Sequence, residues 1–278
     1  MELGLKEIQT AAESIACEAG ALLLAGAENL HKDVKSKTSA MDVVTSTDVA
    51  AEELIVTRIA AAFPGDGILS EEGTSRTGST GRRWIIDPLD GTSNFVRGLN
   101  ASVVSIGVEI DGRFSVGVVY DPFNDQLFSA GTGMGAFRNG VRLPSRPEKT
   151  PIAQAFVGVA GGYASWARAE RAAVAAGLLL HAGDLRYTGS AARDICYVAD
   201  GRLDAYFGNG CFVWDLAAAT VIAREAGCIV SGPLDGTEPT GARALAAIPE
   251  LMSAFRELVS EGIRASTETV DVPGRHAR

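Results

Sequence analysis

The stretch from Trp84 to Phe95 constrains this chain more than any other, because it joins a buried strand to a pair of acidic residues. The apolar run Trp84–Ile86 has the composition of a short buried strand. Pro88 lacks a backbone N–H and fixes its own φ, so we predict that the strand ends there and the chain turns. Asp87 and Asp90 can then converge on one site, where both stay ionised only if cations lie between them.

The residues around this turn indicate phosphate chemistry. Hard divalent ions such as Mg²⁺ prefer a surrounding of carboxylate oxygens. Gly91 and Thr92 come next, and a glycine at this point lets backbone N–H groups approach an anion at the start of the following segment. A metal site beside an anion cradle favours phosphoryl chemistry.

The chain contains an internal comparison, because the pentapeptide Pro-Leu-Asp-Gly-Thr occurs a second time at Pro233 to Thr237. The second copy has no aspartate before its proline and no aromatic-capped strand in front of it. We therefore interpret Asp235 as an ordinary turn residue. The pentapeptide alone indicates little, whereas the full string from Trp84 to Phe95 is specific.

Composition argues against several functional classes. The 278 residues include 25 basic and 34 acidic side chains, a net charge of −9, which argues against nucleic acid as a bulk electrostatic partner. An acidic protein that binds a phosphorylated substrate needs local positive charge, and bound metals are a natural source. The three histidines lie outside any motif, which weakens a zinc or Ser-His mechanism.

The N-terminus and the cysteines favour the cytoplasm. No secretory signal opens the sequence, and the longest uncharged apolar stretch, Ala172 to Gly183, is shorter than the ~18 residues of a membrane span. Four cysteines are scattered without Cys-x-x-Cys spacing, which is typical of small buried hydrophobes in a reducing compartment (Cys17, Cys196, Cys211 and Cys228). We predict a cytoplasmic protein with no membrane partner.

Alternating helical and strand-like patterns predict an α/β protein. Helices are expected from about residue 5 to 30 and from about 49 to 63, the second capped by Thr47 or Asp48. Short apolar runs separated by turn residues predict an antiparallel meander over residues 102–138.

Three prolines near residues 144–151 mark the best candidate boundary between two lobes. After it, strand-like and helical runs alternate from about residue 155 to 226. We predict an N-terminal lobe with the metal-binding loop and the meander over residues 1–143, a C-terminal α/β lobe that completes the site over 144–265, and a frayed tail over 266–278.

Three further carboxylates lie where predicted elements begin or end. Glu71 follows the short strand Ile68–Ser70, although a solvated acidic turn is the commoner explanation of such a residue. Asp48 and Asp215 each open a predicted helix, where an N-capping carboxylate is a complete structural explanation. Singly these residues are ordinary, and their combination with the two aspartates of the central string indicates a site.

Five motifs follow one another in a recognisable order: Asp-x-Val-Thr-x-Thr-Asp ending at Asp48, Ser-Glu-Glu at Glu71, the string from Trp84 to Phe95, Trp-Asp-Leu-Ala-Ala-Ala from Trp214, and Glu-Ala-Gly at Glu225. Together they resemble the inositol monophosphatase family of Mg²⁺-dependent, lithium-sensitive phosphomonoesterases. The resemblance runs from the first helix to about residue 250. It implies the family's layered αβαβα sandwich and a homodimer.

The resemblance also implies roles for the matching residues. The groups that would hold two or three Mg²⁺ ions are Glu71, Asp87, the backbone carbonyl of Leu89, Asp90 and Asp215. Asp87 would bridge two of these ions. Asp48 and Thr92 would form the pair that orients or deprotonates the attacking water, and with Glu71 they make up the predicted catalytic set.

Substrate contacts are implied in the same way. The backbone N–H groups of Gly91 and Thr92 would hold the phosphate at a helix N-terminus, and Lys37 would lie beside the site. The residues expected to contact the sugar or inositol ring are Gly189, Ser190 and Ala191, together with Asp90 and Asp215. The expected partner is a small phosphorylated polyol.

The resemblance leaves the identity of the substrate open. The family's inositol enzymes usually carry a glutamate directly after an aromatic pair, where it accepts hydrogen bonds from ring hydroxyls. Here Tyr206-Phe207 is followed by Gly208. Losing such an acceptor costs about 1–3 kcal/mol. Ser70 in place of the commoner glycine before Glu71 is a smaller departure.

The leading hypothesis is hydrolysis of a small polyol phosphate by a metal-activated water, with inositol 1-phosphate as the best single guess. Phosphatases of the same family that act on histidinol phosphate, fructose 1,6-bisphosphate or 3′-phosphonucleotides are alternatives. A non-catalytic regulatory protein on this fold is another. Such a protein would be expected to have lost one of Asp87, Asp90 or Asp215, and this chain has all three.

Overall fold

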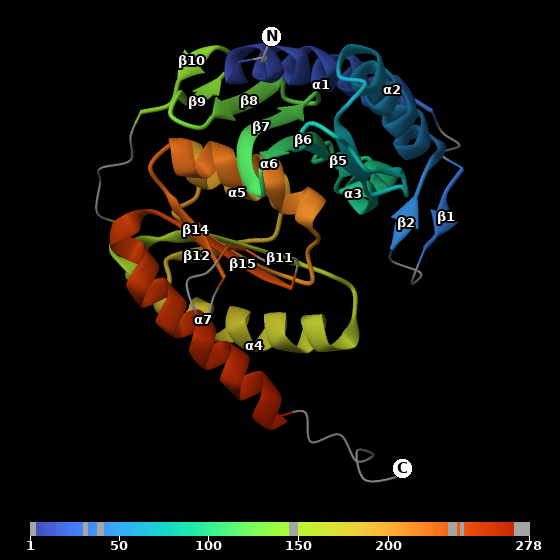
Figure 1. Ribbon diagram of the computed structural model, residues 1–278. Helices are drawn as coiled ribbons and strands as arrows, with labels where there is room; N and C mark the ends of the chain where they lie inside the picture. The colour runs from blue at the N-terminus through green and yellow to red at the C-terminus, as the bar shows by residue number, and fades with distance from the viewer. Residues whose placement is uncertain are drawn as a thin grey trace, which may run out of the picture.

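The computed structural model describes residues 4–29, 33–37, 42–144, 150–232, 238–239 and 242–269. Within these residues, helices and sheets stack in five layers in the order α, β, α, β, α (Figure 1). The predicted layered αβαβα sandwich is therefore confirmed.

The first sheet has eight strands in the order β10-β9-β8-β7-β6-β5-β3-β4. Its strands are β3 (Gly67–Ser70), β4 (Ser75–Arg76), β5 (Arg82–Asp90), β6 (Val103–Ile110), β7 (Arg113–Asp121), β8 (Gln126–Gly131), β9 (Gly135–Arg138) and β10 (Val141–Arg142). Strands β6 to β9 form the predicted antiparallel meander. Strand β3 instead runs parallel to β5, so the C-terminal ends of these two strands lie at the same edge of the sheet.

Strand β5 differs from the sequence prediction, because it does not end at Pro88 but continues to Asp90. Its pairing with β6 is irregular between Asp87 and Asp90, which is the signature of a β-bulge. A bulge accommodates a proline that cannot donate to the ladder. The Leu89 N–H, freed from regular pairing, donates to the Asp87 carboxylate at 3.0 Å.

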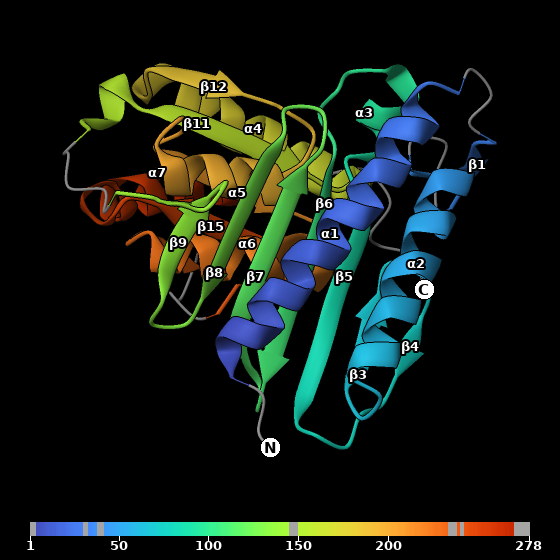
Figure 2. The ribbon, with the colours of Figure 1, turned by 90° about the horizontal axis from the view of Figure 1, so that it is seen from above.

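Helices α1 (Leu5–Ala27) and α2 (Ser46–Ala62) lie side by side over one face of the first sheet (Figure 2). By length and composition alone α1 could also cross a membrane, although it has a buried face that includes Ile8, Ala12 and Leu23. Helix α2 begins earlier than predicted, since its N-cap is Thr45 rather than Thr47 or Asp48. A short hairpin of β1 (Lys35–Ser36) and β2 (Val43–Val44) lies between the two helices in sequence.

The second sheet has five strands in the order β12-β11-β13-β15-β14. They are β11 (Phe156–Gly161), β12 (Asp184–Arg186), β13 (Ala205–Asn209), β14 (Ile229–Ser231) and β15 (Arg243–Ala247), and the short 3₁₀ helix η1 (Ile152–Gln154) precedes β11. Helices α5 (Ala191–Asp200) and α6 (Val213–Glu225) form the layer between the two sheets. Helices α4 (Ser165–His181) and α7 (Pro249–Thr269) cover the outer face.

The C-terminal helix α7 was not predicted from the sequence, although Leu251, Phe255, Val259 and Ile263 recur at helical spacing and are buried. The tail predicted to fray from residue 266 is wrong for residues 266–269, which are still helical. Residues 270–278 and most of the predicted lobe boundary, 145–149, lie outside the described residues.

Candidate active site

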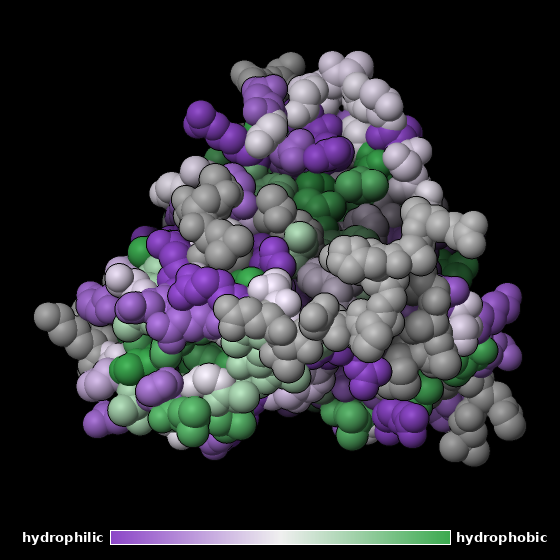
Figure 3. All heavy atoms as spheres, turned by 90° about the horizontal axis from the view of Figure 1, so that it is seen from below, coloured by the Kyte–Doolittle hydropathy of each residue, from purple (hydrophilic) through white to green (hydrophobic). Residues whose placement is uncertain are grey.

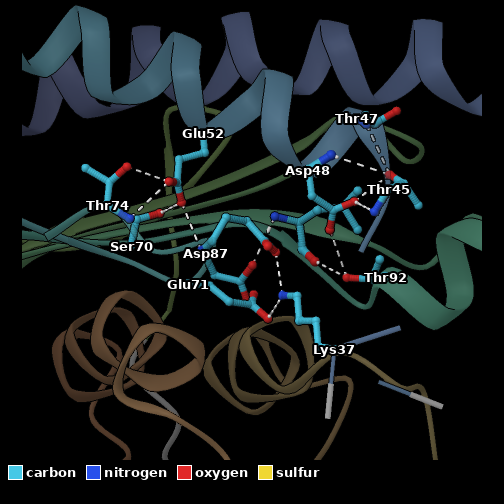
Figure 4. A network of polar contacts seen from close by, with 12 residues as sticks. Lys37, Thr45, Thr47, Asp48, Glu52, Ser70, Glu71, Thr74, Asp87 and Thr92 are labelled. Atoms are coloured by element: carbon cyan, nitrogen blue, oxygen red, sulfur yellow. Dashed lines mark hydrogen bonds and ion pairs between the residues drawn. The ribbon is translucent and has the colours of Figure 1, made fainter. Parts of the chain in front are cut away.

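The predicted site residues meet where the C-terminal ends of β3 and β5 lie together. In the parallel register, Ser70 lies opposite Ile86, and the Glu71 N–H donates to the Ile86 carbonyl at 3.1 Å. Glu71 and Asp87 each follow the last of these paired residues. The parallel pairing therefore places their carboxyl groups beside one another, as Figure 4 shows.

Asp48 and Thr92 also meet, from the first turns of two different helices. Helix α3 (Thr92–Arg97) begins directly after the β5 bulge, and the Thr92 hydroxyl lies 3.0 Å from Asp48 Oδ1 and 3.1 Å from the Leu89 carbonyl oxygen (Figure 4). Asp48 Oδ2 accepts hydrogen bonds from the Thr45 N–H at 2.9 Å and the Thr45 hydroxyl at 2.5 Å. The fully buried Asp48 is therefore fixed by the capping box of α2 and aimed at Thr92.

Gly91 separates the bulge from α3 and has a φ of +94°. A Cβ at this position would lie 2.9 Å from the Ala101 carbonyl oxygen and 3.3 Å from that of Gly189. Both the backbone conformation and the close approach of two carbonyls therefore require glycine. This geometry allows the chain to turn directly from strand β5 into α3 beside the carboxylates.

Asp90 reaches the N-terminus of α5. Its Oδ2 accepts hydrogen bonds from the Ser190 hydroxyl and the Ala192 N–H, both at 2.8 Å. Ser190 is the N-cap of α5, and it lies with Gly189 and Ala191 beside Asp90, while their contact with the substrate stays a prediction. Asn94 of α3 fixes this segment, because its side-chain amide donates to the Thr188 carbonyl at 2.7 Å.

Asp215 comes from α6, which packs closely across the first sheet. Gly107 and Gly117 face α6 so tightly that a Cβ on either would contact the Ala217–Ala218 backbone. The Ser105 hydroxyl, opposite Asp87 in register, donates to the Trp214 carbonyl at 3.1 Å. Because these two positions are glycines, the first turn of α6 can approach the sheet closely. This approach places Asp215 near Asp87.

The carboxyl groups destabilise one another in their ionised form. Burial, followed by the charges of Glu71, Asp90 and Asp215, raises the pKa of Asp87 well above its usual range. Burial and the Asp90 charge do the same to the pKa of Asp215. Burial raises the pKa of Asp90 to about 6, against the hydrogen bonds that it accepts from Ser190 and Ala192. A cation at this place would reverse these shifts.

Lys37 supplies part of that positive charge from the β1–β2 region. Its ammonium group lies 2.9 Å from Glu71 Oε1 and 2.6 Å from Glu72 Oε1 (Figure 4). Although burial opposes it, these carboxylates raise the pKa of Lys37. Lys37 therefore lies beside the site, as predicted, and is held there by the acidic turn after β3.

The donor set fits Mg²⁺ in its chemistry but not in its present arrangement. Carboxylates and the Leu89 carbonyl are the oxygen ligands that a hard cation prefers. Yet within the described residues no three acidic, histidine or cysteine side chains are grouped so that they could hold a metal ion. Instead, Asp87 shares hydrogen bonds with Glu71 and Asp215, and Lys37 pairs with Glu71. Mg²⁺ would take carboxylate oxygens that now share these hydrogen bonds and the Lys37 ion pair.

Helix N-termini are a second source of positive potential, and the sequence analysis expected only the one at Gly91 and Thr92. The N-termini of α2, α3, α5 and α6 all meet at this site through the contacts of Asp48, Thr92, Asp90 and Asp215. Helix N-termini carry partial positive charge and free N–H groups. The acidic chain can thus favour a phosphate here with its backbone, in addition to any metal.

Glu52 is a further residue that the sequence analysis missed. From α2, it accepts hydrogen bonds from the Ser70 hydroxyl, the Glu72 N–H at 3.0 Å, and the Thr74 N–H and hydroxyl at 3.2 and 2.6 Å. It therefore fixes the turn that carries Glu71 (Figure 4). Ser70, an unusual residue before Glu71 by family resemblance, is one of its partners. No local sequence pattern marked Glu52, because its partners come from a turn distant in the chain.

We expect Glu52→Gln to raise the Mg²⁺ concentration for half-maximal activity about tenfold, with a smaller change in kcat at saturating Mg²⁺. The reason is that an amide cannot satisfy four donors, so the Glu71 turn loosens at a cost of about 1–3 kcal/mol. Phosphate release measured as a function of Mg²⁺ tests this. Glu53→Gln, its exposed neighbour, removes the same charge and should change neither quantity. Equal effects of the two substitutions would contradict this role for Glu52.

Gly208 stands at the position where the inositol enzymes of the family usually carry the ring-binding glutamate. A Cβ on Gly208 would collide with the hydroxyl of Tyr206 and lie 3.0 Å from the Cys211 sulfur. Tyr206 is fully buried, and its hydroxyl lies 3.7 Å from the Cys211 Sγ. The Tyr206 side chain fills the space that a side chain at position 208 would need. No carboxylate is therefore present at this position.

One motif residue, Glu225, lies elsewhere. Glu225 accepts hydrogen bonds from the N–H groups of Gly133 and Gly135, at 2.8 and 2.7 Å, so it anchors the β8–β9 turn and stays away from the site. The second pentapeptide, with Asp235, lies outside the described residues.

The protein is an α/β sandwich of five alternating layers. Its acidic residues gather where two parallel strands end and four helices begin, so the fold and the site define the class to which it belongs. The chain belongs to the inositol monophosphatase family, whose sequence model matches residues 4–267. The resemblance seen in the sequence motifs is thereby confirmed.

Named relatives fall into two groups. Nus factor SuhB of Vibrio cholerae is 39% identical over 80% of this chain and 83% of its own length. An inositol-1-monophosphatase of Mycobacterium bovis is 36% identical over 90% of this chain and 93% of its own length. Among solved structures, the extragenic suppressor protein SuhB of Bartonella henselae matches with a TM-score of 0.87 at 29% identity, covering 92% of this chain and 100% of that one.

Proposed function

We propose that this protein hydrolyses a small phosphorylated polyol with the help of Mg²⁺, inositol 1-phosphate being the best single candidate. The observation that carries the proposal is the convergence of Glu71, Asp87, Asp90 and Asp215 beside the Asp48–Thr92 pair. Members of the family are generally dependent on Mg²⁺, and the oxygen donors here match that ion. The number of ions, two or three, and a homodimer stay predictions from the resemblance.

The chain's own residues have distinct tasks in this proposal. Glu71, Asp87, Asp90, Asp215 and the Leu89 carbonyl would hold the ions, which supply charge stabilisation for the phosphoryl group and the leaving oxygen. The N–H groups at Gly91 and Thr92 would orient the phosphate. Thr92 would position the attacking water, and Asp48 would accept its proton through the threonine hydroxyl.

The Asp48–Thr92 pair suits this proton transfer. Burial raises the pKa of Asp48, while hydrogen bonds from Thr45 and Thr92 favour its ionised form. A carboxylate with a raised pKa is a stronger base than one with an ordinary pKa. The hydroxyl of Thr92 can donate to Asp48 while its oxygen accepts a hydrogen bond from water.

We expect Thr92→Val to lower kcat about 100-fold with little change in KM, because valine keeps the shape but removes the hydroxyl that orients the water. Thr92→Ser retains the hydroxyl and should stay within about tenfold of the native kcat. Steady-state kinetics of both variants at saturating Mg²⁺ provide the measurement. If Thr92→Val were as active as Thr92→Ser, the hydroxyl would have no role in the reaction.

The proposed function itself is tested by phosphate release from a panel of phosphomonoesters with Mg²⁺ present and after chelation. We expect Mg²⁺-dependent release, strongest for small polyol phosphates. The panel should include inositol 1-phosphate, histidinol phosphate, fructose 1,6-bisphosphate and a 3′-phosphonucleotide, because the wall at Gly208 lacks the carboxylate that would favour inositol. Full turnover after exhaustive chelation, or no release from any ester, would refute the proposal.

A regulatory role is a second candidate, because several relatives at 39–40% identity are named as Nus factors. The predicted absence of a nucleic-acid partner rested on net charge alone, which does not bear on a protein partner. An Asp90→Asn protein separates the two roles. If this variant has no phosphatase activity but still supports the protein's function in cells, a regulatory role is favoured. If the phosphatase activity and the function in cells are both lost, catalysis is favoured.

A further inference from the structure

Tyr163 links the second sheet to the first turn of α3. It lies between β11 and α4, and α4 belongs to the outer layer of the molecule. Over the visible part of the α4–α7 face, hydrophilic side chains are interspersed with hydrophobic ones, as on an ordinary solvent-facing surface (Figure 3). The Tyr163 hydroxyl instead lies 3.0 Å from the hydroxyl of Ser93, the residue after Thr92. Tyr163 therefore points toward the turn that is expected to hold the phosphate.

The backbone before Tyr163 is fixed against the end of β13. Parallel pairing places Gly161 opposite Asn209, and the Gly162 N–H donates to the Asn209 carbonyl at 2.8 Å. Gly208, which stands where the inositol enzymes of the family usually carry their ring-binding glutamate, directly precedes Asn209. Tyr163 thus follows from the strand end that lies beside the position of the missing carboxylate.

The phenol of Tyr163 is accessible and lies within range of the site's charges. The residue is 40% exposed. Burial raises the pKa of Tyr163 above its usual value, against the hydrogen bond with Ser93, and the charge of Asp90 adds to the rise. A tyrosine hydroxyl can donate one hydrogen bond and accept another. It can therefore contact Ser93 and a substrate hydroxyl at the same time.

Neither Gly208 nor its neighbour Tyr206 can serve a substrate in this way. Gly208 has no side chain, and Tyr206 is fully buried. Tyr163 offers both a hydroxyl and a partly exposed aromatic ring, which can pack against the C–H groups of a polyol. Its chemistry thus fits the part of a substrate that the family's glutamate would otherwise contact.

We propose that Tyr163 is a specificity-determining residue whose hydroxyl contacts a hydroxyl group of the substrate's polyol. The inference rests on the proposed phosphatase function and deepens it, because it assigns polyol recognition to a residue of the β11–α4 connection. The contact lies away from the reacting phosphorus. It should therefore act mainly as uniform binding, which changes KM more than kcat.

The test compares inositol 1-phosphate with cyclohexyl phosphate, which has the same six-membered carbon ring but no free ring hydroxyls. With Mg²⁺ present, we expect the native enzyme to have the higher kcat/KM for inositol 1-phosphate. Tyr163→Phe removes only the phenol hydroxyl. It should raise the KM for inositol 1-phosphate about fivefold, change its kcat less than about twofold, and leave the KM for cyclohexyl phosphate unchanged.

Two further variants separate substrate contact from a structural role. Ser93→Ala removes the same Tyr163–Ser93 hydrogen bond but keeps the phenol, so it should not alter the ratio of the two KM values. Tyr187→Phe removes the hydroxyl of a neighbouring exposed tyrosine, whose ring lies under the Arg171 guanidinium, and should also leave this ratio unchanged.

A native enzyme that does not favour inositol 1-phosphate over cyclohexyl phosphate would overturn the proposal. So would equal increases of both KM values in Tyr163→Phe and Ser93→Ala, because they would assign the hydrogen bond to the support of α3. If neither ester is hydrolysed, the proposed function fails separately. Calorimetry with inositol 1-phosphate and Mg²⁺ then tests Tyr163 alone: binding that Tyr163→Phe weakens about fivefold supports the contact, and binding that is absent or unchanged refutes it.

Discussion

Replacing Asp90 or Asp215 with asparagine is expected to lower kcat by at least about 10³-fold and to leave the fold intact. Each substitution removes a charge from the cation site but keeps the shape of the side chain. Asparagine can still accept the hydrogen bonds that Asp90 receives from Ser190 or Ala192 and that Asp215 receives from Phe212. Loss of the charge weakens cation binding and, with it, the electrostatic stabilisation of the phosphoryl group, on which such reactions mainly depend.

Phosphate release at saturating Mg²⁺ and thermal unfolding of each variant provide the measurements. Asp235→Asn is the matched control, since Asp235 occupies the same pentapeptide as Asp90 and is predicted to be a turn residue. It should retain nearly full activity. If Asp235→Asn were as damaging as Asp90→Asn, the distinction between the two copies of the pentapeptide would be wrong.

The local motifs predicted much of the site because each carries its own structural reason. Asp87 and Asp90 come directly after an apolar run and lie at the end of β5, Gly91 permits the left-handed turn, and Asp215 opens a helix. The meander could be predicted too, because its strands are neighbours in sequence and its turns contain glycine or aspartate. In each case the decisive interactions are local.

Long-range pairings could not be predicted in this way. The parallel register of β3 with β5, which places Glu71 beside Asp87, depends on a contact between segments separated by β4 and its turns. The residues of α6 that contact Gly107 and Gly117 are separated from them by an even longer stretch of sequence. The strand was expected to end at Pro88 because proline was considered alone, whereas the neighbouring β6 supports a bulge. Glu52 was overlooked because its four partners come from a turn that is distant in the chain.

The metal-free protein is expected to lose stability as the pH rises from about 4 to 8, and Mg²⁺ is expected to restore it. The folded-state pKa of Asp90 is about 6 and those of Asp87 and Asp215 are also raised, all above the value near 3.9 of an unfolded aspartate. A group with a raised folded pKa stabilises the fold below its unfolded pKa, and this contribution disappears as the pH passes the folded pKa. For Asp90 alone the loss is on the order of 3 kcal/mol.

Thermal unfolding with and without Mg²⁺ between pH 5 and 8 tests this expectation. At pH 7.5 Mg²⁺ should raise the Tm by about 5 °C or more, and at pH 5 by much less, because protonated carboxyls bind cations poorly. Asp194→Asn separates this effect from ordinary burial. Burial raises the pKa of Asp194 to about 7, so its removal should flatten the pH dependence but leave the gain from Mg²⁺ unchanged. Asp90→Asn should reduce both. A Tm that does not respond to Mg²⁺ at pH 7.5 would show that the carboxylates do not share a cation.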